Sequence, residues 1–224
     1  MRVFIVGMGK LAHELRAKLC LSAPLYLAEW PDRASSEGRS IVIHAGSGRE
    51  LVDVKDHCCR THSTLIELST DSEGSFPALS HPVVLCPNAN ILMLKFMAMM
   101  ERCGHLFKGH EINLTESHQS SKASVPGTAV NMAASLGLPL AAIRSVRDPE
   151  IQRGALGISS DALSRHAFHE VVIQSGGCSL NFTSLVVGDS PYAHGVARIV
   201  EAVRLHPLED RVHSIMEFVD AGWL

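Results

Sequence analysis

Short apolar runs alternate with amphipathic segments in the first part of the chain. The runs have the continuous, β-branched character of buried parallel strands, and the segments between them have helical spacing of apolar positions. Strands separated by helices predict an α/β fold, namely a doubly wound, Rossmann-like parallel sheet. We expect strands at residues 3–6, 24–28, 40–44, 64–68 and 82–85, and helices at 10–19 and 49–61.

The second part of the chain follows a different pattern. Residues 91–107 are apolar nearly all round, which predicts a mostly buried helix whose methionines (93, 97, 99 and 100) lie in a core rather than on a binding surface. Gly176-Gly177 is typical of a hairpin turn. The mixture indicates a second, α+β domain. Its strands are expected at 111–116, 141–146, 166–174 and 179–187, with a helix at 128–136; two more helices, at 193–205 and 208–221, follow in the chain.

A glycine motif lies between the first predicted strand and helix. Gly7-Met8-Gly9-Lys10-Leu11-Ala12 has the GxGxxA spacing of a dinucleotide-binding turn, in which the first glycine makes the turn and the second lets the backbone meet a pyrophosphate. Glu29 ends the second predicted strand, where an acid bonds the adenosine ribose. The alternative is a Rossmann-like turn that binds no phosphate.

The motif predicts NADH or NADPH as cofactor. Glu29 would repel the 2′-phosphate of NADPH, whereas Lys10 and Arg33 would soften that repulsion, so both cofactors stay open. Ala45-Gly46 follows the third strand, at the carboxyl edge of the sheet where cofactors bind. The cofactor-binding residues expected from these positions are Gly7, Gly9, Lys10, Leu11, Glu29, Ala45 and Gly46.

A loop after the strand at 111–116 gathers candidate chemistry. His118 is the one side-chain type that titrates near physiological pH, and Lys122 supplies a point charge. Gly127 and Thr128 open a helix, whose unpaired N–H groups form a seat for a carboxylate or phosphate. The alternative is a solvated loop before an ordinary helix cap.

Composition narrows the class of partner. With 46% hydrophobic residues, 19% charged residues, a net charge of -3 and a pI near 6.5, the chain is globular and is not a general nucleic-acid binder. Six cysteines without a CxxC pair indicate reduced thiols in the cytoplasm and no metal site. The longest apolar run, 91–100, contains Lys95 and is too short to cross a membrane. A small-molecule ligand is therefore expected.

The motifs together resemble a known family. Glu116-Ser117-His118-Gln119, Lys122 and Gly127-Thr128-Ala129 look like the signature of dihydrodipicolinate reductase, an NAD(P)H-dependent enzyme of diaminopimelate and lysine biosynthesis, in the HQ form of the plant-type branch. Matches continue through Ile143-Arg144, Arg147-Asp148-Pro149, His166-Ala167-Phe168-His169 and Tyr192-Ala193-His194-Gly195. The chain departs at Ser124-Val125-Pro126, where Asp-Ala-Ser is usual, and at Asp189, where a basic residue is usual.

The resemblance implies roles for several residues. His118 would be the general acid, and Lys122, Gly127 and Thr128 would hold a carboxylate of a cyclic dicarboxylate substrate, with Gln119 orienting it. The turn with Ser69 and Thr70 would run beside the nicotinamide, and Asn88 would approach the cofactor amide.

The resemblance also implies an organisation. Residues 1–90 and 200–224 would form the dinucleotide-binding domain, and 91–199 a substrate-binding domain whose open sheet pairs in a homo-oligomer, a dimer or a tetramer. His166 and His169 would not share a metal, because strand residues three apart face opposite sides. Two alternatives stay open: a related reductase or dehydrogenase for another cyclic imino or amino acid, and a catalytically idle NAD-binding relative.

Overall fold

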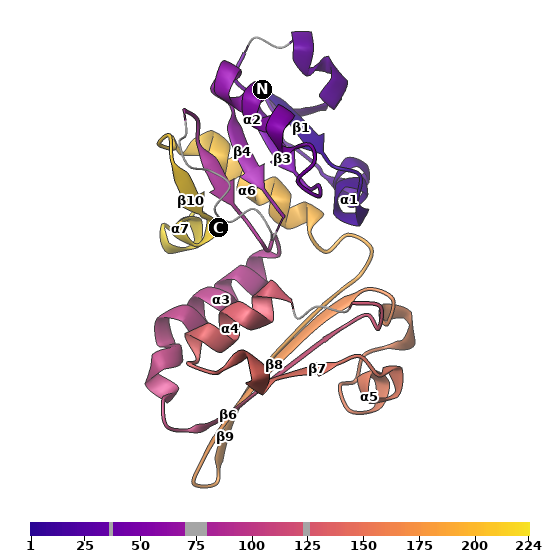
Figure 1. The fold of residues 1–224 in the computed structure, drawn as a ribbon, viewed down its shortest axis with the longest axis vertical. Helices are drawn as coiled ribbons and strands as arrows, with labels where there is room; N and C mark the ends of the chain where they lie inside the picture. Colours follow the sequence, from indigo (N-terminus) through magenta and orange to yellow (C-terminus); the bar gives the residue numbers. More distant parts are fainter. Residues whose placement is uncertain (36–37, 70–79, 123–125) are drawn as a thin grey trace. The chain divides into compact units, whose positions relative to one another are not determined.

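The computed structural model describes residues 1–35, 38–69, 80–122 and 126–224. It divides into two compact units, each described by itself (Figure 1). Unit 1 comprises Met1–Leu94 and Tyr192–Leu224, and unit 2 comprises Lys95–Pro191. The first boundary falls inside helix α3 (Ile91–Cys103). Thr70, Ser124 and Val125, which the sequence singled out, lie outside the described residues.

Unit 1 is built on a six-stranded parallel sheet with the order β10-β5-β4-β3-β1-β2. The order reverses at β1, because β2 pairs with one of its edges and β3 with the other. In open parallel sheets, ligands bind at the carboxyl ends of the strands beside such a reversal. The strands are β1 (Arg2–Val6), β2 (Tyr26–Ala28), β3 (Ile41–His44), β4 (Thr64–Glu67), β5 (Val83–Leu85) and β10 (Val212–Ser214).

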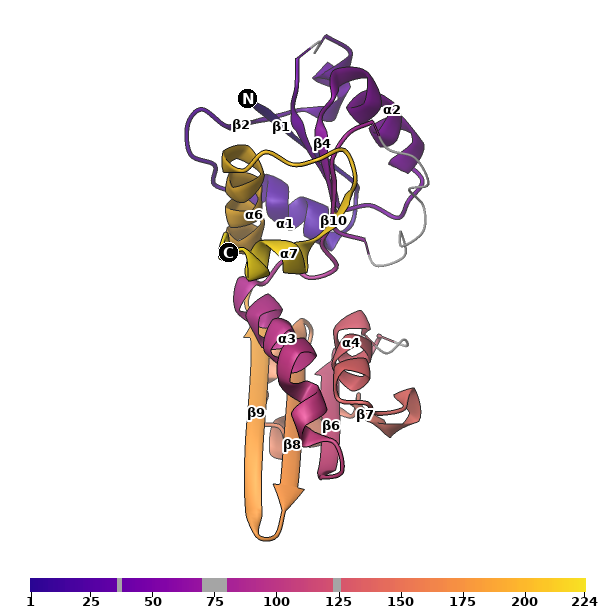
Figure 2. The same cartoon turned by 90° about the vertical axis from the view of Figure 1, so that its left-hand side faces the viewer.

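Helices cover both faces of this sheet, which confirms the doubly wound prediction (Figure 2). One apolar core packs β-strand side chains against α1 (Lys10–Lys18), α6 (Ala193–Leu205) and α7 (Ile215–Asp220). A second core on the other face packs them against α2 (Leu51–Thr61), with Trp30 of the short helix η1 (Trp30–Ser35) beside it.

The prediction of a single helix over 208–221 was wrong. Residues Val212–Ser214 instead form β10, which pairs with β5 and completes the sheet. α7 then begins with a capping box, in which the Ser214 side chain accepts from the Met216 N–H at 3.2 Å and the Glu217 side chain accepts from the Ser214 N–H at 2.9 Å. The helical start signal therefore lies at Ser214, and the residues before it are free to extend.

Two close contacts lock α6 into unit 1. The carboxylate of Glu14 on α1 is buried and accepts from the backbone N–H groups of Tyr192 and Ala193 at 2.8 and 3.0 Å, so it caps α6. In the first turn of the same helix, a Cβ built on Gly195 would lie 1.7 Å from the Ala89 carbonyl oxygen. The loop before α3 and the start of α6 therefore touch backbone to backbone.

Unit 2 is a four-stranded sheet with the order β7-β6-β8-β9. The β8–β9 hairpin turns at Gly176 and Gly177, whose positive φ values of 53° and 85° confirm the predicted turn. The elements are β6 (Glu111–His118), β7 (Ile143–Val146), β8 (His166–Ser175), β9 (Cys178–Val187), α4 (Gly127–Ser135), α5 (Pro149–Gly154) and the short helices η2 (Gly104–Phe107), η3 (Leu140–Ala142) and η4 (Ser160–Ala162).

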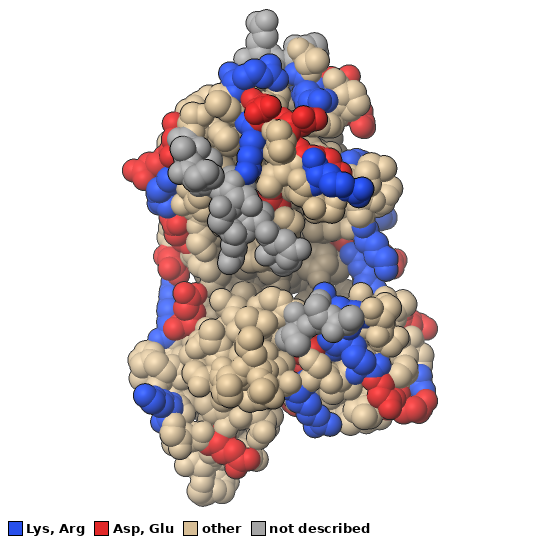
Figure 3. Space-filling model, in the orientation of Figure 1, with Lys and Arg blue, Asp and Glu red and all other residues tan. Residues whose placement is uncertain are grey.

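Helix α3 buries one face, and its other face and its last turn are exposed. Met93, Met97 and Met100 lie in the core as expected, whereas Met99 is 39% exposed, so the prediction was wrong for that residue. On the face drawn in Figure 3, the surface over α3 and α4 is largely uncharged. None of the helices within the described ranges is long and apolar enough to cross a membrane.

Candidate active site

A polar row crosses one face of the unit 2 sheet. The strand register aligns Ser145 of β7, Glu116 of β6, His169 of β8 and Ser184 of β9. The row before it on the same face is apolar and includes Leu114, which is 1% exposed. Strand side chains alternate between faces, so His118 lies on this face one step beyond Glu116. The ionisable side chains of Glu116, His118 and His169 therefore lie next to the apolar core of the sheet.

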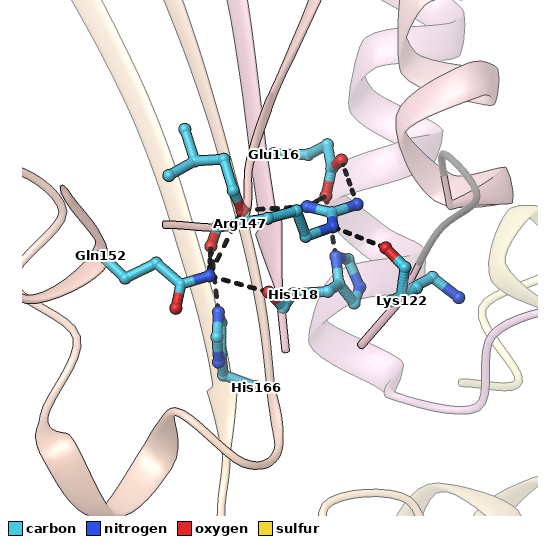
Figure 4. Close-up of polar contacts among 8 residues, drawn as sticks. Glu116, His118, Lys122, Arg147, Gln152 and His166 are labelled. Atoms are coloured by element: carbon cyan, nitrogen blue, oxygen red, sulfur yellow. Dashed lines mark hydrogen bonds and ion pairs between the residues drawn. The ribbon is translucent and has the colours of Figure 1, made fainter. Parts of the chain in front are cut away.

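Glu116 anchors the row. Its side chain is fully buried, and Arg147 binds it with two charge-assisted hydrogen bonds, from Nη2 to Oε1 at 2.7 Å and from Nη1 to Oε2 at 3.1 Å (Figure 4). Burial alone would raise the pKa of Glu116, but hydrogen bonds from His118, Arg147 and Ser145 lower it to about 2. Glu116 is therefore ionised at any physiological pH.

His118 is oriented by this carboxylate. Its Nδ1 lies 2.9 Å from Glu116 Oε2, and because an ionised carboxylate only accepts, Nδ1 carries the hydrogen. Nε2 is hydrogen-bonded by no residue in the described part of the chain. The ring keeps 13% of its side-chain surface exposed. The arrangement leaves one ring nitrogen available to exchange a proton with a ligand.

The loop after β6 is tied to the same arginine. Arg147 Nε donates to the Lys122 carbonyl oxygen at 2.9 Å, and the Lys122 ammonium points away from Arg147 (Figure 4). Arg147 thus binds the Lys122 backbone directly and reaches His118 only through Glu116, the carboxylate that both of them contact. Gln119 is half-buried between them, and its carbonyl oxygen accepts from the Lys122 N–H at 3.0 Å.

The predicted helix start is present. α4 begins at Gly127 after Pro126, no side chain of the described residues caps it, and its first turn has no acidic residue. Gly127 is exposed and Thr128 is half-buried. The N-terminus of a nine-residue helix favours anions through its first backbone N–H groups and its dipole.

Two other imidazoles lie near His118. His169 stands edge-on to it at 5.6 Å between ring centroids, and burial, then the His118 charge, lowers the pKa of His169 to about 4 despite the opposing effect of Glu116. His166 lies 6.5 Å from His118 and hydrogen-bonds Ser117. His166 and His169 occupy opposite faces of β8, as their spacing predicts. In both imidazoles, burial lowers the pKa below its ordinary value.

In unit 1, Gly7 and Ala45, two of the residues predicted for the cofactor, meet at the carboxyl ends of β1 and β3. A Cβ on Gly7, whose φ is 130°, would lie 2.3 Å from the Ala45 carbonyl oxygen, so only glycine fits. Among the described residues, no atom lies within 4 Å of the Cβ position of Gly9 and no side chain caps α1, the helix that follows, whose first turn has no acid. This open, positively polarised helix start fits a pyrophosphate.

The other predicted cofactor residues differ in exposure and in their hydrogen bonds. Lys10 and Glu29 are exposed, and Asn88 lies on the loop before α3, where its side chain accepts from the Asn90 N–H at 2.9 Å. Leu11 is half-buried and packs against the apolar core. Ser69 is half-buried, and its N–H already donates to Glu67 at 2.8 Å.

Sequence reasoning missed a buried pair beside the cofactor turn. His44 and Glu67 end β3 and β4, both side chains are fully buried, and His44 Nδ1 lies 2.7 Å from Glu67 Oε2. A Cβ on Gly46 would lie 2.6 Å from His44 Nε2, so this glycine makes room for the ring. His44 was seen only as the last residue of a strand, and the pairing depends on the β3–β4 register.

Glu116 and Arg147 were missed as site residues as well. The signal for Glu116 was present, because it shares a strand face with Ile112 and Leu114 and a buried carboxylate needs a partner. No comparable signal identified Arg147 as that partner, since the two residues are 31 positions apart.

No protein-family model matches the chain. A protein named probable 4-hydroxy-tetrahydrodipicolinate reductase 1, chloroplastic, from Oryza sativa subsp. japonica is 32% identical over 123 residues, which cover 50% of this chain and 36% of the relative. The 4-hydroxy-tetrahydrodipicolinate reductase 1, chloroplastic, of Arabidopsis thaliana is 29% identical over 154 residues, which cover 62% of this chain and 44% of the relative. The matched segments therefore span less than half of these relatives.

The fold has a solved counterpart. A dipicolinate-bound dihydrodipicolinate reductase from Paenisporosarcina sp. TG-14 has a TM-score of 0.67 and 14% sequence identity, over 95% of this chain and 97% of that chain. The chain has the dihydrodipicolinate reductase fold, and the resemblance seen in its motifs is confirmed by similarity in both sequence and fold.

Proposed function

We propose that this chain is an NAD(P)H-dependent 4-hydroxy-tetrahydrodipicolinate reductase, which reduces the dihydrodipicolinate precursor to tetrahydrodipicolinate in diaminopimelate and lysine biosynthesis. The single observation that carries the proposal is His118, held by an ionised Glu116 with Nε2 open, on the strand that leads to Lys122 and the helix start of α4. This set matches what reduction of a cyclic imine with carboxylate groups requires, namely an acid beside an anion seat.

The cofactor would supply a hydride to the unsaturated carbon of the substrate. His118 would donate a proton from Nε2 to the neighbouring carbon, and the Glu116 carboxylate would stabilise the imidazolium before transfer. Lys122, Gly127 and Thr128 would hold a substrate carboxylate, and Gln119 would orient the ring. Lys122 has no side-chain partner among the described residues, which leaves its ammonium available for this contact.

NADH is the cofactor we propose as the preferred one. Glu29 is exposed at the end of β2, where it would repel a 2′-phosphate. Arg33, the cation nearest to it in sequence, is already engaged: its guanidinium lies 4.5 Å over the Trp30 ring, donates to the Trp30 carbonyl oxygen and approaches Asp53 at 3.8 Å. These contacts hold the Arg33 guanidinium towards Trp30 and Asp53, so it is poorly placed to bind a phosphate.

We expect His118→Ala to lower kcat by about a hundredfold or more, since general acid catalysis contributes roughly 10²–10⁴. NADH affinity should not change, because the cofactor residues lie in unit 1. The measurement is NADH or NADPH oxidation followed at the nicotinamide absorbance, with the substrate precursor generated in situ by its synthase. Lys122→Ala should raise KM in the same assay. An unchanged kcat in His118→Ala would remove this residue from the mechanism.

A second candidate function follows from Asp189. Its side chain is exposed just after β9, at the end of the sheet where His118 pairs with Ala167 and Ala167 with Val186. A carboxylate there disfavours a dianionic substrate and favours a cyclic imino acid with a single carboxylate. A panel of such imines in the same assay separates the two reactions. Cofactor and dipicolinate binding without any turnover would indicate the idle relative.

We propose a homo-oligomer, a dimer or a tetramer, assembled through β9. This strand pairs only with β8 among the described strands, and Leu185 and Val187 are 45% and 43% exposed on one of its faces. Leu185→Lys should reduce the mass measured by light scattering, whereas Leu140→Lys, at a residue 61% exposed on η3, should not. A mass unchanged by Leu185→Lys would count against this surface.

All six cysteines are free thiols, which suits a reducing compartment such as the cytoplasm.

A further inference from the structure

A buried amide lies behind the candidate acid, on the opposite face of the unit 2 sheet. Gln152 on α5 is 1% exposed, and its Nε2 donates to the His118 carbonyl oxygen at 2.8 Å and to Ser117 Oγ at 3.0 Å, with a longer contact of 3.3 Å to the Val146 carbonyl oxygen (Figure 4). One side chain thus connects the end of β6, which carries His118, to the end of β7, which leads into Arg147.

The hydrogen bonds around Ser117 run in one direction. The Ala162 carbonyl oxygen can only accept, so His166 Nδ1 is the donor in their 3.0 Å contact. In the neutral ring, Nε2 is then an acceptor, and it takes the Ser117 hydroxyl hydrogen at 3.0 Å. Ser117 Oγ in turn accepts from Gln152. Burial lowers the pKa of His166, opposed by the hydrogen bond to the Ala162 carbonyl oxygen and reinforced by the His118 charge.

This network fixes the backbone of His118 from one face while Glu116 and Arg147 fix its ring from the other. The residue that carries the proton is therefore held at its carbonyl oxygen by Gln152 and at Nδ1 by Glu116. Gln152 and the Arg147 side chain that binds Glu116 both belong to the segment that continues β7, because Arg147 directly follows this strand and Gln152 lies on the next helix. Asp148 caps that helix by accepting from the Glu150 N–H at 2.8 Å, which stabilises the helix start between Arg147 and Gln152.

We propose that Gln152 is a positioning residue for the reaction, acting through the backbone of His118 to set where Nε2 points. The inference rests on the proposed function for the role of His118. A displacement of a catalytic group by about 1 Å can cost as much as a hundredfold in rate. Gln152 touches no predicted substrate-binding side chain, so its loss should leave substrate affinity largely intact.

The test uses Gln152→Met, which keeps the length of the side chain and removes both N–H donors. We expect kcat to fall by about tenfold to a hundredfold with KM nearly unchanged. In Gln152→Glu, kcat should fall further, because a carboxylate would face the His118 and Val146 carbonyl oxygens. Ser117→Ala keeps the hydrogen bond from Gln152 to the His118 carbonyl oxygen, so its kcat should fall less than that of Gln152→Met. Gln174→Met, at an exposed residue near the other end of β8, is the matched control.

A second readout needs no substrate. In the free wild-type protein, the His118 Nδ1–H bonded to Glu116 should give a slowly exchanging NMR signal, assigned by its loss in His118→Ala. The inference predicts that Gln152→Met broadens or shifts this signal in protein that is still folded by circular dichroism. An unperturbed signal, or a lower Tm with wild-type kcat in the folded fraction, would overturn it. If the wild type turns over no imine, the proposed function fails, and the NMR result alone decides the positioning role.

Discussion

Gly195→Ala should destabilise unit 1 by about 3 kcal/mol or more, at the upper end of the range for overpacked sites. The new Cβ would lie 1.7 Å from the Ala89 carbonyl oxygen, and both partners are backbone, so neither can move aside by changing a rotamer. α6 would have to shift away from the loop before α3, and Asn88 on that loop would move with it. Urea unfolding at equilibrium measures the loss.

Gly154→Ala is the matched control for this substitution. Gly154 is exposed at the end of α5, has no positive φ, and has no atom within 4 Å of its Cβ position. Alanine there should be neutral or stabilising by up to about 1 kcal/mol, because it favours the helix. Equal stability of the Gly195→Ala variant and the wild type would show that the backbone contact at α6 is not as close as described.

Arg147→Met should destabilise unit 2 by about 3–5 kcal/mol at neutral pH, the cost of leaving one member of a buried ion pair alone. Glu116 has no exposed side-chain surface, and the variant would keep its carboxylate inside without the guanidinium. Arg153→Met, on α5, is the control: it removes an exposed pair with Glu150, for which we expect less than 1 kcal/mol.

The effect of Arg147→Met should depend on pH. In the folded wild type, the pKa of Glu116 is lowered from its ordinary 4.5 to about 2. Its ionised form therefore stabilises the folded state fully above pH 4.5, and this contribution to the free energy of unfolding is lost as the pH falls towards 2. The shift corresponds to about 3 kcal/mol. The stability difference between wild type and variant should therefore narrow from pH 7 to about pH 3. A difference that is constant over this range would mean that Glu116 is not the group responsible.

The sequence predicted the repeating parts of the fold better than its connections. The apolar runs and the GxGxxA turn specify the parallel sheet locally, and Gly176-Gly177 specifies the hairpin. β10 escaped prediction because a three-residue strand has no periodicity of its own and becomes extended only by pairing with β5. α5 escaped because its six residues are too few to show a helical face, although Asp148-Pro149 is a typical helix start.

The candidate site was predicted where its residues are close in sequence. His118 and Lys122 came from one loop, but Glu116, Arg147 and Gln152 owe their roles to the pairing of β6 with β7 and to the packing of α5. Strand pairing is a long-range property that a single sequence does not display. The buried position of Glu116 was implied by strand alternation, while the identity of the group that neutralises it was not.

The way β10 completes the sheet has a consequence for how the protein is made. During synthesis, β5 leaves the ribosome before the whole of unit 2, and its partner β10 follows only after it. Until then, β5 has an unpaired edge, which can recruit strands from neighbouring chains. Unit 2 is continuous in the chain and can fold first. Nascent chains halted before Val212 should therefore depend on chaperones more than the full-length protein does.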